Sequence, residues 1–310
     1  MLKGKDLISI HDLSADEVFE ILDCAANLKV MQKNNIPHQF LKGKTLGMIF
    51  EKSSTRTRVS FEVGIFQLGG TGLFLSNKDL QLGRGEPIKD TARVLSRYLD
   101  GIMIRTYGHD RILELAKYSD VPVINGLSDL LHPCQVLTDL LTIREHKGKN
   151  FRSLKMAYVG DGNNMTNSYL YGAAKVGMNL TVATPQKYEP NALVFEQALT
   201  DAEETKAELV WTENPVDAVK DADIIATDTW ASMGQEAEHD ERKKIFAPYQ
   251  VNAELLKHAS KNAIVLHCLP AYRGEEITDE VFENNAHVIF EEAENRLHTQ
   301  KAIMALTMAD

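Results

Sequence analysis

The stretch "TLGMIFEKSSTRTRVSFEVGIFQLGGTGLFLS" (residues 45–76) decides the fold. Two short apolar runs, 45–50 and 71–76, flank a segment at 54–68 whose apolar residues keep helical spacing. Continuous apolar strands that alternate with amphipathic helices are typical of a parallel sheet that helices cover on both faces. The stretch therefore predicts a strand, a helix and a second strand of one parallel sheet.

The same alternation runs through the rest of the chain. Further strands are predicted at 101–106, 121–126, 155–161, 180–185, 208–213, 223–229, 263–269 and 287–292. Helical patterns at 87–99 and 109–118 separate the strands of the first half. The chain is therefore predicted to be an α/β protein with two doubly wound parallel-sheet domains joined by bridging helices.

A segment at 128–148 separates the two series of strands. Pro133 can occupy the first turn of a helix, and the apolar residues after it keep helical spacing until Gly148 ends the helix. We therefore place the domain boundary near 145–152, with one domain at 1–147 and the next at 148–290. The final residues, 291–310, are predicted to form a helix that packs back on the first domain.

Composition excludes several classes of function. With 310 residues the chain can form two domains, and 34 basic against 44 acidic residues give a net charge of −10. This charge argues against nonspecific nucleic-acid binding, although a local cluster of arginines can still bind an anionic substrate. Three widely spaced cysteines without a CxxC motif argue against a disulfide framework or a structural zinc site. The absence of a signal-like N-terminus and of any long apolar run makes the cytoplasm the expected compartment.

Hydroxyl and guanidinium groups gather after the strand at 45–50. Ser54, Thr55, Arg56 and Thr57 lie at the start of the predicted helix, and Arg58 follows them. Free N–H groups at a helix N-terminus, together with hydroxyls and arginines, favour a phosphate or another oxyanion. The alternative is an ordinary Ser/Thr N-cap with solvated arginines. The glycines of a Walker loop are missing.

Other polar residues follow strands or open helices. Arg105 ends a strand, where open α/β sheets bind ligands. His132 and Gln135 flank Pro133 and Cys134; His132 is either a capping or surface residue or a hydrogen-bond donor to a substrate carbonyl. Cys134 is interpreted as a packing residue.

In the second half, "YVGDGNNMTNS" (158–168) resembles a dinucleotide-binding turn but lacks the third glycine, so it supports a nicotinamide cofactor only weakly. Asn163 and Asn164 could instead hold an amino-acid head group. Asp228, after another strand, is either a counter-ion for a substrate ammonium or an ordinary cap. The segment 234–249 has seven charged residues between 236 and 244 and no periodic apolar face, which indicates a solvated loop or a mobile lid.

Four motifs in order, "STRTR", "HPCQ", "DTWASMG" and "HCLP", resemble the signatures of the aspartate/ornithine carbamoyltransferase family. The resemblance covers essentially the whole chain, and the Ser-Met-Gly motif with HCLP points to the branch that uses ornithine. It implies transfer of a carbamoyl group from carbamoyl phosphate to the δ-amine of ornithine, giving citrulline and phosphate. It also implies carbamoyl-phosphate binding by the first domain, ornithine binding by the second, at least a homotrimer, and neither cofactor nor metal ion.

The resemblance also implies roles for individual residues. Carbamoyl phosphate would be bound by Ser54, Thr55, Arg56, Thr57, Gln81, Arg105, His132, Gln135, Cys268, Leu269 and Arg296, with Gln81 acting on the site of a neighbouring subunit. Ornithine would be bound by Asn164, Asp228, Ser232 and Met233. The catalytic residues would be Arg105, His132 and Cys268. The segment 234–249 would be a lid that closes over the substrates.

Cys268 has several possible roles. It could be a nucleophile beside His267, a metal ligand or a substrate contact. Neighbours on a strand point to opposite faces, which argues against a thiolate–imidazole pair, and no second metal ligand lies at a useful spacing. We therefore interpret Cys268 as a contact near the ornithine side chain, with Leu269 and Pro270 shaping the turn.

Four other functions remain as alternatives. Within the family, aspartate and putrescine are the competing substrates. Aspartate would call for a basic loop where this chain has Asp228, and putrescine lacks the carboxylate of the amino-acid head group that this site would bind. Outside the family, the alternatives are a nucleotide-binding oxidoreductase and a noncatalytic binding protein.

Overall fold

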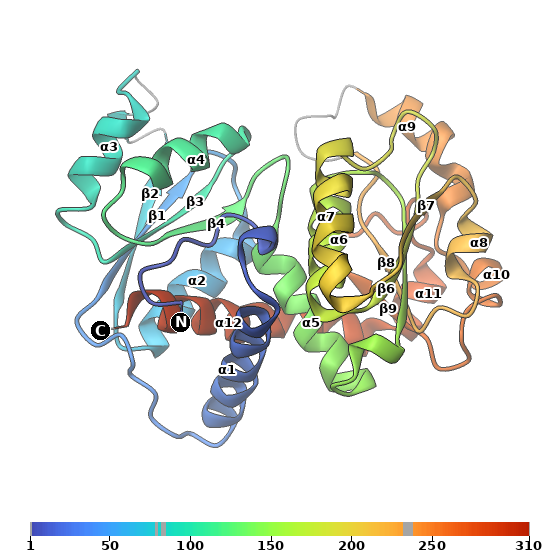
Figure 1. Cartoon of the computed structure of the whole chain (residues 1–310), viewed down its shortest axis with the longest axis horizontal. Helices are drawn as coiled ribbons and strands as arrows, with labels where there is room; N and C mark the ends of the chain where they lie inside the picture. The colour runs from blue at the N-terminus through green and yellow to red at the C-terminus, as the bar shows by residue number, and fades with distance from the viewer. Residues whose placement is uncertain (1, 78–79, 82–84, 232–237, 310) are drawn as a thin grey trace. The chain divides into compact units, whose positions relative to one another are not determined.

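The computed structural model describes residues 2–77, 80–81, 85–231 and 238–309. The chain forms two compact units, which are described separately (Figure 1). The first unit comprises Met1–Leu141 and Asn295–Asp310, and the second comprises Thr142–Glu294. The chain passes from one unit to the other within two helices, α5 (Pro133–Lys147) and α12 (Ala286–Met308). The predicted boundaries, near 147 and 290, lie at the end of the first of these helices and inside the second.

The first unit is built on a four-stranded sheet with the order β2-β1-β3-β4, and every pair is parallel. The strands are β1 (Thr45–Phe50), β2 (Thr71–Ser76), β3 (Gly101–Arg105) and β4 (Val123–Leu127). The helices confined to this unit are α1 (Ala15–Lys33), α2 (Thr55–Gln67), α3 (Ile88–Leu95) and α4 (His109–Tyr118), preceded by the short 3-10 helix η1 (Ile10–Asp12).

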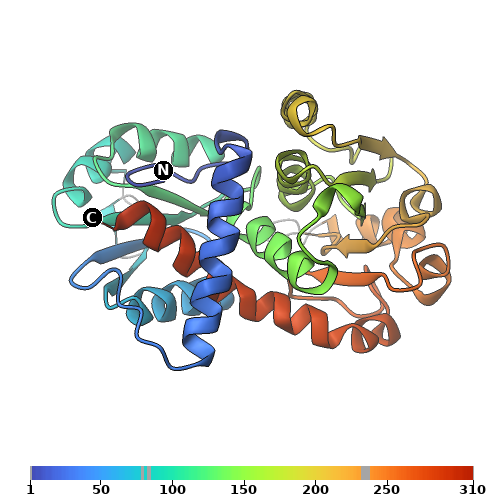
Figure 2. The ribbon, with the colours of Figure 1, turned by 60° about the horizontal axis from the view of Figure 1, so that its bottom comes forward.

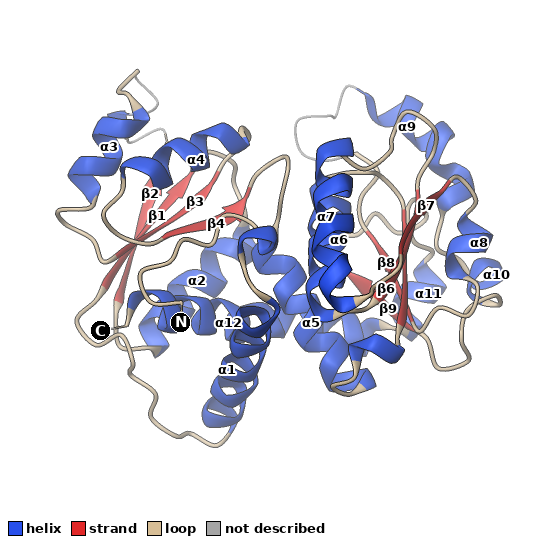
Figure 3. Cartoon of the chain, in the orientation of Figure 1, coloured by secondary structure: helices blue, strands red, loops and turns tan. Residues whose placement is uncertain are grey.

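Helices cover both faces of this sheet. Figure 3 shows α3 and α4 on one face and α2 with the end of α12 on the other. Isoleucines of β1 and β3 pack with Ile112 and Leu115 of α4 to form a buried core. A Cβ atom on Gly101, at the start of β3, would lie 2.9 Å from the sulfur of Met308, so this glycine allows the last turn of α12 to pack closely on the sheet.

The second unit has a five-stranded parallel sheet with the order β7-β6-β5-β8-β9. The strands are β5 (Lys155–Val159), β6 (Asn179–Ala183), β7 (Leu209–Thr212), β8 (Ile224–Thr227) and β9 (Ile264–His267). The α-helices are α6 (Asn164–Val176), α7 (Ala192–Thr205), α8 (Pro215–Val219), α9 (His239–Phe246), α10 (Ala253–Leu256) and α11 (Asp279–Asn284). Two 3-10 helices are η3 (Phe151–Ser153) and η5 (Ala247–Tyr249).

Each sheet has one point at which the chain reverses the direction in which strands are added. In the first unit this point lies between β1 and β3, and in the second it lies between β5 and β8. At such a switch point the loops after the two strands diverge and leave a crevice at the carboxyl ends. The residues after β1, β3, β5 and β8 are therefore the first places to look for a site. The predicted fold class, two parallel-sheet α/β domains, is confirmed.

Two predicted elements are wrong. The segment 287–292 is not a strand but the start of α12. Val288, Ile289 and Glu292 are buried while His287 and Phe290 are exposed, which is the spacing of a helix rather than the alternation of a strand.

The loop predicted at 234–249 is wrong from residue 239 onward. Residues 239–246 form α9, whose two buried side chains, Arg242 and Phe246, lie one turn apart. The buried face of this helix consists of one charged and one apolar residue among other charged residues, so it produces no apolar periodicity in the sequence. Residues 234–237 lie outside the described part of the chain. Among the described residues, no helix has the length and apolar character needed to cross a membrane.

Candidate active site

The turn after β1 ends in the N-cap of α2, and the N-terminus of this helix has features that favour an anion. Ser54 is the N-cap, and its hydroxyl accepts a hydrogen bond from the backbone N–H of Thr57 at 3.2 Å. The Ser54 hydroxyl also donates to the Thr57 hydroxyl at 3.1 Å. The first turn of α2 contains no acidic residue, so the positive end of its dipole is not neutralised from within the helix.

A buried hydrogen-bond network joins this turn to α5 and α12. The Arg296 guanidinium donates to the Thr57 hydroxyl at 2.8 Å and to the side-chain oxygen of Gln135. The Gln135 amide in turn donates to Asp139 at 2.8 Å. Arg296 is 4% exposed, and Thr57 and Gln135 are each 1% exposed. Three of the predicted residues, from three helices, therefore meet in the first unit.

His132 lies among positive charges. Its pKa is well below the ordinary histidine value, first because the ring is buried and then because the cations of Arg296, Arg105, Arg56 and Lys52 disfavour its protonation. The imidazole is therefore neutral at physiological pH, and it can donate or accept a hydrogen bond without adding a charge. Four cations around a neutral histidine suit a strongly anionic ligand.

Lys52 was not among the residues predicted from the sequence. It is 5% exposed, its ammonium bonds the Asp129 carboxylate at 3.1 Å, and it lies 4.9 Å from the ring centre of Tyr107. Its position directly after β1, two residues before the N-cap, was the signal available in the sequence. Arg58, by contrast, is exposed, bonds Glu62 at 3.0 Å and stacks on Phe74.

Two predicted residues of the first unit lie at its surface. Gln81 and Thr55 are both exposed. The backbone carbonyl of Gln81 accepts a hydrogen bond from the Glu86 N–H at 3.1 Å, while its side chain is on the surface. The structure therefore does not bring the Gln81 side chain to the network around Thr57.

In the second unit, the ends of β5 and β9 place two polar side chains against the carboxylate of Asp228, which follows β8. Asn163 caps α6, accepts from the Met165 N–H at 2.9 Å and donates to Asp228 at 3.0 Å. The Cys268 thiol donates to the other oxygen of Asp228 at 3.2 Å. Asn164, the first residue of α6, is partly exposed beside this cluster. Ser232 and Met233 lie outside the described residues.

The HCLP turn is held by the imidazole of His267. The Leu269 N–H donates to Nδ1 at 2.9 Å, so the other ring nitrogen carries the proton and donates to Glu276, also at 2.9 Å. Glu276 also accepts from the Tyr272 N–H at 2.7 Å. His267 and Cys268 therefore have different partners, and the thiol is bonded to a carboxylate rather than to the imidazole.

The comparison with known sequences decides the family. The carbamoyl-P binding domain of aspartate/ornithine carbamoyltransferase matches residues 5–145, and its Asp/Orn binding domain matches residues 152–307. The chain belongs to the aspartate/ornithine carbamoyltransferase family. The resemblance of the four sequence motifs is thereby confirmed.

Similar members of this carbamoyltransferase family match over nearly their full length. An ornithine carbamoyltransferase of Carboxydothermus hydrogenoformans is 59% identical over 99% of this chain and 98% of its own. One of Thermococcus kodakarensis is 56% identical over 99% of this chain and 97% of its own. The solved ornithine carbamoyltransferase of Pyrococcus furiosus has a TM-score of 0.96 and 54% identity, over 99% of this chain and 98% of that one.

The second unit of this carbamoyltransferase also contains a set of possible metal ligands. Atoms of Asp228, His267 and Cys268 lie within 4.8 Å of one another. The sequence-based expectation of no second ligand near Cys268 is wrong in this respect, because the neighbouring strand β8 supplies Asp228. Both ring nitrogens of His267 are already bonded, so it would have to give up Glu276 or the Leu269 N–H to bind an ion.

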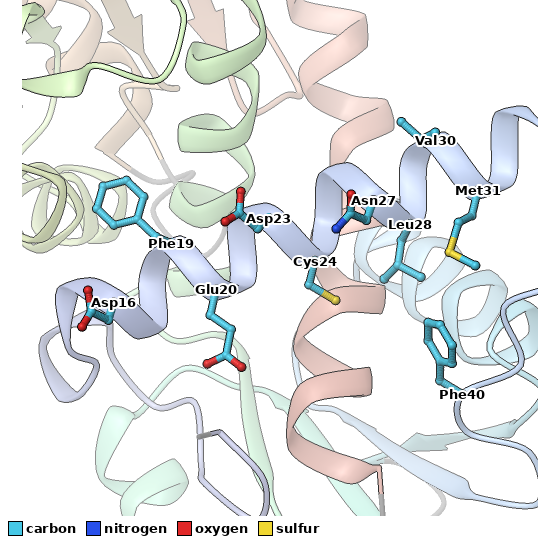
Figure 4. A pocket seen from close by; sticks show the side chains of 10 residues that line it. All are labelled: Asp16, Phe19, Glu20, Asp23, Cys24, Asn27, Leu28, Val30, Met31 and Phe40. Carbon is cyan, nitrogen blue, oxygen red and sulfur yellow. The ribbon is translucent and has the colours of Figure 1, made fainter.

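A pocket along α1 lies apart from the predicted site residues. Figure 4 shows that α1 supplies all of its lining except Phe40, and that Asp16, Glu20 and Asp23 make one part of it acidic. Apolar contacts come from Phe19, Leu28, Val30 and Met31. None of the residues predicted to bind carbamoyl phosphate or ornithine is among those that line it.

Proposed function

We propose that this chain transfers the carbamoyl group of carbamoyl phosphate to the δ-amine of L-ornithine, giving L-citrulline and phosphate. The observation that carries the proposal is the full-length match to ornithine carbamoyltransferases at 54–59% identity. The two family domains supply the matching chemistry, one for carbamoyl phosphate and one for an amino-acid acceptor.

Carbamoyl phosphate binds in the first unit. Its phosphate is held by Arg56, by the hydroxyl of Thr55, and by the backbone N–H groups of residues 54–56 at the N-terminus of α2. Arg105 and Arg296 add buried positive charge, and Gln135 is held in place by Arg296. Buried arginines bind a phosphate more strongly than exposed ones because water screens them less.

The carbamoyl carbonyl is bound by neutral and charged donors. The Thr57 hydroxyl already accepts hydrogen bonds from Ser54 and Arg296, which occupy both of its lone pairs. Its own proton can therefore be donated to the carbonyl oxygen of the substrate. Arg105 and neutral His132 are the other donors. As the amine attacks, charge develops on this oxygen, and each donor of this kind contributes roughly 3 kcal/mol in other enzymes.

Ornithine binds in the second unit. The Asp228 carboxylate is a counter-ion for the substrate α-ammonium, and Asn163 and the Cys268 thiol fix its orientation. Asn164, Ser232 and Met233 complete the ornithine contacts, and Cys268 and Leu269 also contact carbamoyl phosphate. The neutral δ-amine attacks the carbamoyl carbon, the new C–N bond forms, and the C–O bond to phosphate breaks. The attacking nitrogen then passes one proton to the departing phosphate, and no covalent enzyme intermediate is required.

A citrulline assay on the purified protein tests this function. Ornithine, putrescine and aspartate are each supplied with carbamoyl phosphate, and only ornithine is expected to give substantial turnover, because Asp228 repels a dicarboxylate and putrescine lacks the α-carboxylate of ornithine. Arg56→Ala should lower kcat/KM for carbamoyl phosphate by about a hundredfold. Turnover with aspartate or putrescine that exceeds turnover with ornithine would contradict the proposal, and near-wild-type activity of Arg56→Ala would contradict the phosphate site.

We also propose that the active form is at least a homotrimer. Strand β2 is an edge strand, and the α2–β2 surface exposes Val59, Val63, Phe66, Leu73 and Phe74, with Phe66 77% exposed. A cluster of exposed apolar side chains beside a sheet edge is typical of a protein interface. Gln81 follows β2 and, as a surface residue, would serve the site of a neighbouring subunit. Light scattering on the purified protein should give a mass of at least three 34.7 kDa chains, and a monomer would contradict the proposal.

The physiological direction is proposed to be citrulline formation in arginine biosynthesis. A relative of Pyrococcus furiosus that is named anabolic is 54% identical over 99% of this chain. The three cysteines are free thiols, which fits a reducing compartment such as the cytoplasm. Citrulline formation that is not favoured over citrulline phosphorolysis at cellular substrate levels would contradict this direction.

A further inference from the structure

Arg242 is a buried cation for which the proposed chemistry has no role. It projects from α9 and is 4% exposed. Its guanidinium donates to the carboxylate of Asp161 and to the backbone carbonyl of Trp230. Its plane lies against two aromatic rings, 4.8 Å from the centre of Tyr188 and 5.2 Å from that of Phe246. Such a fork-shaped contact needs the planar guanidinium and is not reproduced by lysine.

The two partners of Arg242 lie in the two turns that carry the proposed ornithine contacts. Asp161 is in the turn between β5 and α6, two residues before Asn163. Trp230 follows β8, two residues after Asp228. The two turns are on either side of the switch point between β5 and β8, and Asn163 joins them directly by donating to Asp228. Arg242 supplies a second, buried connection between the two turns, because it donates to one residue of each.

Close packing around the first turn leaves it little freedom. The Asp161 carbonyl accepts from the Thr166 hydroxyl at 2.6 Å, and the Gly162 N–H donates to the Tyr188 carbonyl at 3.0 Å. A Cβ atom on Gly162 would collide with the backbone of Tyr188 and Glu189, so the segment that carries the Tyr188 ring lies directly on this turn. Arg242 therefore stacks on the ring of a residue whose backbone carbonyl is hydrogen-bonded to the turn.

The charge of Arg242 also matters for Asp161. The pKa of Asp161 is raised to about 7, because burial and the nearby charge of Asp228 outweigh the lowering effect of Arg242. Without the guanidinium, Asp161 would be a buried carboxyl close to a second carboxylate, and it would take up a proton rather than remain charged. Arg242 therefore opposes the protonation of Asp161 and holds its carboxylate in place.

We propose that Arg242 is a positioning residue that sets the ornithine contacts by tying the turn after β5 to the segment after β8. The proposal rests on the proposed ornithine site. It predicts that Arg242 affects recognition of ornithine and not of carbamoyl phosphate, because Asp161 and Trp230, to which it donates, both belong to the second unit.

Steady-state kinetics of Arg242→Gln, with each substrate varied in turn, test the proposal. The matched control is Lys244→Gln, which removes the same charge from an exposed position on the same helix. We expect the KM for ornithine to rise about tenfold, while the KM for carbamoyl phosphate stays within about twofold of the control. Arg242→Lys keeps the charge but loses the fork-shaped contact, so its KM for ornithine should lie between those of Arg242→Gln and the control. If Arg242→Gln does not fold, Arg242→Lys and Asp161→Asn are judged by the same comparison.

Two outcomes would overturn the positioning role. One is a KM for ornithine less than about threefold above the control, and the other is an equal rise in both KM values. The second result would mean that Arg242 only stabilises the fold. Failure of the proposed function looks different, since the wild-type protein itself would then form no citrulline from ornithine.

Discussion

At the scale of single residues, the side chain that the motif leaves most ambiguous is Cys268. Its thiol donates to Asp228 at 3.2 Å, while the imidazole of the adjacent His267 bonds Glu276 and the Leu269 backbone. A nucleophilic cysteine needs a neighbouring base to remove its proton, and here the neighbouring histidine is turned to other partners. The thiol is placed to orient the carboxylate that would bind the substrate.

Cys268→Ser should therefore weaken recognition of ornithine without abolishing turnover. Serine keeps a donor for Asp228 but is shorter, so we expect the KM for ornithine to rise by about three- to tenfold and kcat to remain measurable. Kinetics with both substrates check this. A carbamoyl-thioester on Cys268, trapped and detected by mass spectrometry, would show instead that the cysteine is a nucleophile.

The other two cysteines are expected to be inert. Burial raises the pKa of Cys134 to about 12 and that of Cys24 to about 11, the latter with help from Glu20. Since the thiolate is the reactive form, neither should be alkylated by iodoacetamide at pH 8 in the native protein. Both should react once denaturant is added. Peptide mapping of native and denatured samples checks this, and native labelling of Cys134 at the denatured rate would contradict it.

At the scale of elements, α12 is tied to its unit by a buried ammonium. Lys301 donates to Gln32 of α1 at 2.6 Å and to Gln67 of α2 at 3.0 Å, and its nitrogen lies 3.2 Å from His38. Figures 1 and 2 both show the last turns of α12 beside α1 and α2. None of these partners carries a carboxylate, and burial lowers the pKa of Lys301 to about 8.

This lowered pKa predicts a pH dependence of stability. Between about pH 8 and the ordinary lysine pKa of about 10.4, the unfolded chain keeps a proton that folded Lys301 has lost. More protons are then bound in the unfolded state, so the free energy of unfolding rises with pH across this window. Urea unfolding at pH 7.5, 8.5 and 9.5 should show this rise for the wild type relative to Lys301→Met, and a constant difference between the two would contradict it.

The elements also show how far sequence patterns reach. Nine of the ten predicted strands are present because buried parallel strands are short continuous apolar runs, which 45–50 and 264–267 illustrate. The tenth, 287–292, has the same composition but buries one helical face, and composition alone cannot distinguish the two. Helix α9 was missed because its buried face consists of one arginine and one phenylalanine.

The scale of the whole molecule explains which site contacts the sequence could not reveal. Arg296 bonds Thr57 and Gln135, which lie 239 and 161 residues away in the chain. Motifs show that such residues have functional types, but only the fold shows which of them touch. The sequence analysis did not identify Lys52, Arg242 or Asp161 for the same reason: the role of each depends on residues of other elements. Within each unit, the switch point of the sheet brings together the turns that follow the strands on either side of it.

The reaction as a whole should be governed at low pH by the substrate and not by His132. The δ-ammonium of ornithine, with an ordinary pKa of about 10.4, must lose a proton before it attacks, so kcat/KM for ornithine should rise close to tenfold per pH unit from pH 6 to 9. His132 stays neutral throughout, because its pKa is held well below the ordinary value by burial and by the surrounding cations.

The His132→Asn variant separates the two sources of pH dependence. Because His132 does not titrate in this range, the variant should have a lower kcat/KM at every pH but the same slope and position of the rising limb. A profile of kcat/KM against pH for both proteins measures this. A flat wild-type profile would contradict the need for amine deprotonation, and a limb that moves in the variant would show that His132 itself gains or loses the proton that controls the rate.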